Sequence, residues 1–155
     1  MGAVRIARSR WRSQAGQVLV IFALALPVLL GLAAIVVDAG NLFVEKRSVQ
    51  KAADSAALAA AQRLTGLACD SLCQDDVATL AGSFSGGNLS GDTDPLPECN
   101  PPSITSNCYE ILGTDRVRVR LTRTVSTFFG GLIGKGSVDI RARAVASRFP
   151  YHNQH

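Results

Sequence analysis

The sequence is poor in histidine, the side chain that enzymes use most often as a general acid or base. Its 155 residues include two, His152 and His155, and both lie within the last four positions. The strings GxSxG and HExxH, the Walker loop and the glycine fingerprint of dinucleotide-binding folds are also absent. We therefore expect a protein that is not an enzyme and has no cofactor. We interpret residues 149–155 as a frayed tail rather than a metal site.

Charged side chains are missing from Val18–Val37, a run of twenty residues without any side-chain hydrogen-bond donor. A helix of this length rises about 30 Å, the thickness of the hydrocarbon layer of a bilayer. Two alternatives are a buried core helix and a cleaved secretory signal, with Leu32–Ala34 as the cleavage site. The run is longer than the apolar region of an ordinary signal, which has about 7–15 residues. We predict a transmembrane helix over residues 16–37, with a bend at Pro27.

The net charge of +4 is confined to the residues before this run. Without Arg5, Arg8, Arg10 and Arg12, the 16 basic residues become 12, which equals the 12 acidic ones. The soluble part therefore has no basic excess, which argues against nucleic-acid binding. Arginines beside a span stay in the cytoplasm. We expect residues 1–15 to be a cytoplasmic basic tail and the C-terminal part to lie outside the inner membrane.

All four cysteines fall on the exported side of the predicted span. An even number in an oxidising compartment favours two disulfides, for which three connectivities exist. The most local connectivity joins Cys69 to Cys73 and Cys99 to Cys108, although the sequence leaves the choice open. These spacings are unfavourable for a zinc site.

Residues 38–66 read as an alanine-rich amphipathic helix. Apolar residues between Leu42 and Leu64 recur at spacings of three, four and seven, which places them on one helical stripe. Ala53, Ala56 and Ala60 make that stripe smooth. It is suited either to covering the chain's own sheet or to packing against other subunits. The pair Gly40-Asn41 could form a flexible joint with the preceding helix.

Residues 67–115 change in composition, with four prolines, four cysteines and eight acidic residues but no basic one. We expect acidic loops pinned by disulfides, with a short helix at Asp75–Ser83. Asp92, Asp94 and Glu98 suggest a calcium loop, but the EF-hand pattern and its glycine are missing. A solvated acidic loop is the preferred interpretation.

Residues 116–148 contain two segments in which apolar and polar residues alternate, as in half-buried strands. Core positions are Val117, Val119, Leu121, Val125, Val138, Ile140, Ala142 and Ala144. Antiparallel pairing of the two segments would gather arginines on the outer face. That basic face either balances the acidic loops within one chain or meets those of a neighbouring subunit. The expected fold class is α+β and pilin-like, with a transmembrane helix, an alanine-rich extension and a small antiparallel sheet.

The segment Gly16–Leu64 resembles the N-terminal part of the TadE/TadG-like Flp pilus assembly proteins. The most specific portions are FALALPVLLGLAAIVVDAGNLF, residues 22–43, and QKAADSAALAAA, residues 50–61. The first of these contains Pro27, Asp38 and Gly40.

The resemblance implies a minor-pilin-like component of the tight-adherence (Tad) machine that works by assembly with other pilin-like subunits. Such proteins are held in the bacterial inner membrane by one helix. Pilin-type proteins commonly carry a glutamate five residues after the glycine cut by prepilin peptidase. If Gly16 were that glycine, Ile21 would stand in the place of the glutamate, so the resemblance favours an uncleaved anchor. The alternative hypothesis is a membrane-tethered periplasmic binding or sensor domain that uses the basic sheet face. Neither hypothesis calls for a small-molecule substrate of an enzyme.

Overall fold

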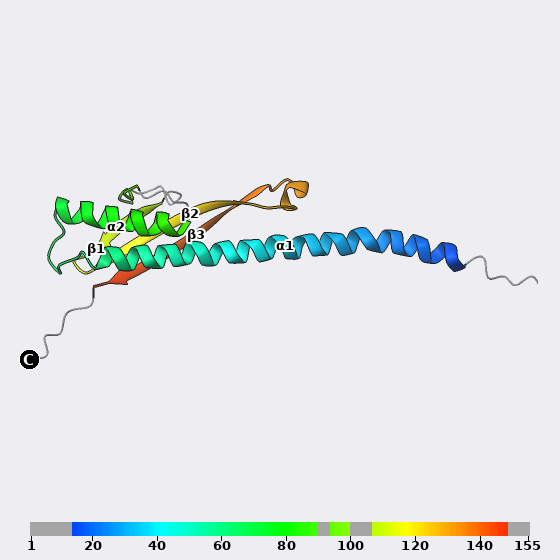
Figure 1. Cartoon of the computed structure of the whole chain (residues 1–155), viewed down its shortest axis with the longest axis horizontal. Helices are drawn as coiled ribbons and strands as arrows, with labels where there is room; N and C mark the ends of the chain where they lie inside the picture. Colours follow the sequence, from blue (N-terminus) through cyan, green and yellow to red (C-terminus); the bar gives the residue numbers. More distant parts are fainter. Residues whose placement is uncertain (1–13, 90–93, 100–106, 149–155) are drawn as a thin grey trace, which may run out of the picture. The chain divides into compact units, whose positions relative to one another are not determined.

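The computed structural model describes residues 14–89, 94–99 and 107–148 (Figure 1). Its elements are α1 (Gln14–Ala61), α2 (Ser71–Leu89), β1 (Cys108–Leu112), β2 (Arg116–Ser126), the 3-10 helix η1 (Gly130–Ile133) and β3 (Ser137–Ser147). The three strands form one antiparallel sheet in the order β1-β2-β3. The predicted α+β class is therefore confirmed. The chain divides into two compact units at Val37/Asp38, and each is described by itself.

The described part of the first unit is residues 14–37, the N-terminal portion of α1. Its large apolar side chains are exposed, with exposed fractions between 42% at Leu26 and 70% at Leu19 and Val36. An isolated helix with an apolar surface on all sides suits lipid rather than water. By length and composition, this helix is a candidate membrane span.

Helix α1 continues through Gly40 and Asn41 without interruption, so the flexible joint considered there is not present. A glycine inside a helix costs about 1 kcal/mol relative to alanine, which the strong helix formers around it can offset. The helix ends at Ala61, earlier than the predicted limit at residue 66. Backbone bonds from Arg63 to Ala60 and from Leu64 to Ala61 tighten the turn that follows.

Alternation in β2 and β3 sorts their side chains between a buried and an exposed face, as predicted. The register pairs Val117 with Ala146 and Val125 with Val138. Most of the predicted core positions on these strands are buried. Val138 is the exception, with 37% of its surface exposed, because it lies one residue from the end of β3 nearest the turn.

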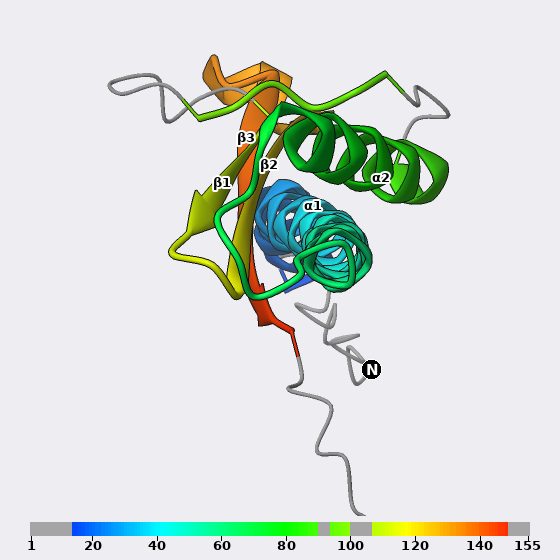
Figure 2. The same ribbon diagram turned by 90° about the vertical axis from the view of Figure 1, so that its left-hand side faces the viewer.

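The core of the second unit is built largely from alanine. Helix α1 lies against one face of the sheet, and α2 packs beside it (Figure 2). Ala53, Ala56 and Ala60 are completely buried in this core, together with Val49 and Leu64. The alanine stripe therefore covers the chain's own sheet and α2. Its use as a packing face for other subunits, which the sequence left open beside this one, stays a prediction.

The described residues of the region 67–115 contain more regular structure than the loops expected there. Helix α2 is 19 residues long, whereas the short helix predicted at Asp75–Ser83 covers only its middle. The carboxylate of Asp70 accepts the backbone N–H of Cys73 at 3.0 Å and so caps the helix N-terminus. Small buried residues let α2 approach its neighbours closely: Ala78, Ala81, Gly82, Ser85 and Gly86. Gly82 and Gly86 are therefore packing residues of this helix.

Candidate functional site

Asp38 is the first residue after the apolar run, and its carboxylate binds the turn between β2 and β3. Its two oxygens accept the backbone N–H groups of Phe128, Phe129 and Gly130 at 2.9, 3.0 and 2.9 Å. A carboxylate that accepts several backbone N–H groups forms strong, charge-assisted bonds. Sequence analysis noted Asp38 as the end of the apolar run and as part of the family resemblance, but it missed this role.

The β2–β3 hairpin runs along α1 toward the candidate span. Gln50 donates to the carbonyl of Arg143 at 3.4 Å, in the middle of the hairpin. Further along the hairpin, the contact on α1 moves back to Glu45, and at the turn it reaches Asp38. The hairpin therefore brings its turn to Asp38, the first residue after the apolar run.

We call residues 127–136 the hairpin tip. The tip closes on itself through backbone bonds from Leu132 to Phe129, from Gly134 to Gly131 and from Lys135 to Gly130. Gly130 has no room for a side chain, because an added Cβ would meet Thr127 and the Lys135 carbonyl. The apolar side chains remain outside this closed backbone. Phe128 is 74% exposed and Leu132 is 85% exposed.

Arg123 is a second residue that sequence analysis missed. It occupies one of the alternate positions of β2 that face the core, where the pattern predicts an apolar residue. Its guanidinium donates to the carbonyl of Leu89, the last residue of α2, at 3.0 Å. The same Nη1 atom lies 3.5 Å from the carboxylate of Glu45 on α1. Arg123 thus joins the sheet to both helices near the end of the core.

A groove between α1 and α2 offers an apolar surface. Leu58 and Ala59 line it from α1, while Leu80 and Phe84 line it from α2. Leu58 is 57% exposed and Phe84 is 45% exposed. Polar residues at the rim are Ser55, Gln62 and Arg63. Such a strip is suited to a side chain or helix from another subunit.

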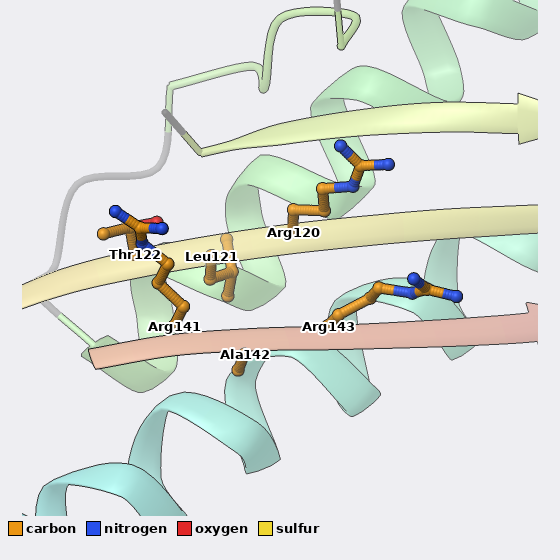
Figure 3. A pocket seen from close by; sticks show the side chains of 6 residues that line it. All are labelled: Arg120, Leu121, Thr122, Arg141, Ala142 and Arg143. Atoms are coloured by element: carbon orange, nitrogen blue, oxygen red, sulfur yellow. The ribbon is translucent and has the colours of Figure 1, made fainter. Parts of the chain in front are cut away.

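The outer sheet face carries the arginines that the alternation predicted. Arg120 and Arg143 occupy directly opposite positions on β2 and β3, and Arg141 lies beside them (Figure 3). Glu110 on β1 forms ion pairs with Arg118 at 2.8 Å and with Arg120 at 3.5 Å. Part of the positive charge is therefore balanced within one chain, and a shallow basic surface remains around Arg141 and Arg143.

The four cysteines form two disulfides, Cys69–Cys73 and Cys99–Cys108. These are the most local of the three connectivities left open by the sequence. The second disulfide joins β1 to residues 94–99, where Leu96 enters the core. Within the described ranges, no group of three or more histidine, cysteine or acidic side chains is arranged to hold a metal ion.

The other predicted site residues lie in or before α1. Pro27 and Gly16 are inside the helix, and Gly16 has no neighbour within 4 Å of the position of an added Cβ. The predicted topology signal lies outside the described residues: Arg5, Arg8, Arg10 and Arg12. Asp92 of the rejected calcium loop and the two histidines of the tail also lie outside them.

The segment that contains Asp38 is similar to a known protein family. Residues 16–63, about a third of the chain, match the Tad family model, described as Flp pilus-assembly TadE/G-like. Residues 16–63 form a TadE/G-like segment. This match confirms the resemblance over these residues. The TadE/G-like segment includes the candidate span, Asp38 and the alanine stripe. No curated protein and no solved structure matches the chain.

Proposed function

We propose that the protein is a membrane-anchored, minor-pilin-like structural and assembly component of a Tad Flp-type pilus or a related secretion system. It acts through helix–helix packing with other subunits rather than by catalysis. The observation that carries this proposal is the uncovered apolar helix within the TadE/G-like segment, continuous with the core helix of a folded domain. The helix holds the protein in the inner membrane, and the folded domain contacts the assembly machine.

The proposed orientation leaves the N-terminus in the cytoplasm and residues 38–155 outside it. Two observations support it. The arginines that precede the span favour a cytoplasmic tail by the positive-inside rule. Both disulfides lie beyond the span, and such bonds persist in oxidising compartments such as the bacterial periplasm.

The surfaces available for subunit packing are the span and the outward face of α1. The alanine stripe is occupied by the chain's own core, whereas Phe43 and Val44 are 68% and 67% exposed. Leu58, further along α1, lines the groove shared with α2. Helices pack in lipid through close contact of small side chains, and Ala25 lies in the middle of the span on an exposed surface.

Photo-crosslinking in cells that carry the Tad system tests this role. A photoreactive amino acid at Ala25 should trap another pilin-like subunit, because the span would lie in contact with it. A matched probe at Leu72, 75% exposed on α2, reports non-specific capture. Adducts with lipid alone from the Ala25 position, in cells that assemble pili, would contradict the proposal.

The intact mass of the membrane-extracted protein tests retention of the anchor. An uncleaved chain has the full sequence mass less four hydrogens for the two disulfides. Cleavage after Gly16 would remove the first 16 residues and favour a filament subunit. Cleavage after Ala34 would remove the anchor and leave a secreted protein, which is incompatible with the proposed function.

The alternative function, a tethered binding or sensor domain, is favoured by one observation. Two arginines, Arg120 and Arg143, face each other across neighbouring strands; Glu110 lies 3.5 Å from Arg120, so a bound anion would offset the like charges mainly beside Arg143. Replacing Arg141 and Arg143 by glutamine separates the two hypotheses. Pilus assembly by this double variant should persist if packing of α1 is the function. Pilus assembly should be lost if the basic face binds the partner.

A further inference from the structure

The hairpin tip exposes apolar side chains that the folded domain does not use. Phe128, Phe129 and Leu132 are 74%, 43% and 85% exposed, and Lys135 is the only charged residue of the tip. A cluster of this kind at the end of a long hairpin indicates a contact surface rather than a core element.

The position of the tip in the chain indicates which surface its apolar side chains contact. Asp38 accepts three backbone N–H groups of the tip, and Asp38 is joined by one peptide bond to Val37, the last residue of the span. If the span lies in a bilayer, its end lies at the surface of that bilayer. The tip is hydrogen-bonded to Asp38, the residue that directly follows this end.

The backbone of the tip is prepared for an environment poor in water. An unpaired N–H group costs several kcal/mol in lipid. Asp38 accepts those of Phe128, Phe129 and Gly130, while carbonyls within the hairpin accept those of Thr127, Leu132, Gly134 and Lys135. The apolar side chains can therefore enter the membrane interface while these seven N–H groups keep their hydrogen-bond acceptors.

We propose that the hairpin tip is a second membrane contact, inserted into the interface of the leaflet at which the span ends. Phe128, Phe129 and Leu132 enter the boundary between headgroups and acyl chains, to a depth of about 5–10 Å. Lys135 lies at the headgroup level and meets lipid phosphate. With Asp38 as the link, the span and the tip hold the folded domain at the membrane by two points instead of one.

Fluorescence quenching by brominated lipid tests the contact in the full-length protein. Single-tryptophan variants are made in the Trp11→Phe background and reconstituted in phosphatidylcholine–phosphatidylglycerol vesicles. The phosphatidylcholine acyl chains are either unmodified or brominated near the headgroup. The Phe128→Trp variant should lose emission in brominated vesicles to an extent comparable to Phe22→Trp, whose reporter lies in the span. Leu72→Trp, on an equally exposed position of α2, should keep its emission.

The proposal rests on the proposed membrane anchor, and the three reporters separate the two. Loss of quenching in Phe22→Trp would overturn the anchor itself. Quenching in Phe22→Trp, with Phe128→Trp behaving like Leu72→Trp, would overturn the tip contact and leave the anchor standing. Leu132→Trp provides a second reporter at the most exposed tip position, should the aromatic substitution at residue 128 disturb the turn. Asp38→Ala in the Phe128→Trp background should reduce quenching, because the tip is no longer bound to the end of the span.

Discussion

The guanidinium of Arg123 lies 3.5 Å from the carboxylate of Glu45, and the pair sits where β2, α1 and α2 meet. The Oε2 atom of Glu45 is buried, so this arginine is its compensating charge. Arg123 also caps α2 by donating to Leu89, which satisfies one of the carbonyls that a helix C-terminus leaves open. One side chain thus performs two functions that the hydrophobic core cannot supply.

Replacing Arg123 by leucine should destabilise the folded domain by about 1–3 kcal/mol, because it removes the hydrogen bond to the Leu89 carbonyl and the charge that faces Glu45. Urea unfolding of the detergent-solubilised protein, followed by circular dichroism, measures the change. The matched control is Arg141→Leu on the exposed outer face, which should shift stability by less than about 1 kcal/mol. Adding Glu45→Leu to Arg123→Leu should restore part of the loss. Equal effects of the two arginine substitutions would contradict the role assigned to Arg123.

Asp38→Ala should release the hairpin tip while the sheet stays folded. Three backbone N–H groups lose their acceptor, and the expected loss of local stability is about 1–3 kcal/mol. Hydrogen exchange with mass spectrometry should show faster exchange at Phe128, Phe129 and Gly130, with the centre of β2 unchanged. Asp38→Asn, which keeps one carbonyl oxygen, should give an intermediate rate. Unchanged exchange at the tip would show that the carboxylate does not hold it.

Two glycines of α2 should respond in opposite directions to alanine. A Cβ at Gly82 would collide with the backbone of Asp94 and Pro95, so Gly82→Ala should destabilise the domain and displace residues 94–99. Gly87 has nothing within 4 Å of the same position, so Gly87→Ala should stabilise the helix by about 0.5–1 kcal/mol. Thermal unfolding of the two variants gives the sign directly, and a gain in stability from Gly82→Ala would contradict the close packing described.

Stability should fall in strongly alkaline solution because of Tyr109. Burial raises the pKa of this phenol above its ordinary value of 10.0, and the carboxylates of Glu98 and Asp75 add to the rise. The folded state therefore keeps the phenol proton at a pH where the unfolded state has lost it. The contribution of this group to stability is complete below pH 10.0 and declines as the pH rises through the folded-state pKa. Urea midpoints measured below and above pH 10.0 should decline less in Tyr109→Phe than in the parent.

Periodicity was sufficient to predict the elements whose stability depends on one local pattern. The charge-free run, the alanine stripe and the alternating strands each repeat one spacing over many residues, and the structure has all three. Helix α2 was predicted only in its middle, at Asp75–Ser83, because the glycines that follow have low intrinsic helix propensity. Gly82 and Gly86 are compatible with a helix here because their small size permits close packing, which is a tertiary effect.

The contacts of Asp38 and Arg123 could not be predicted for a different reason. Asp38 meets partners 90 to 92 positions away in sequence, and no local spacing encodes such a contact. Arg123 interrupts the series of apolar, core-facing residues in β2. In the sequence alone, such an interruption resembles the end of a strand. The disulfide pairing was one of three possibilities, and the structure shows the local one.

In the proposed orientation, the bond between Asp38 and the β2–β3 turn also orders events during export. Residue 38 leaves the membrane early, whereas its partners at residues 128–130 follow about ninety residues later. The carboxylate thus has no turn to bind until almost all of the chain has been translocated. Closure of so long a loop is a late and slow step in folding. In that orientation, a molecule that lacks residues 128–130 would reach the membrane surface without this clamp.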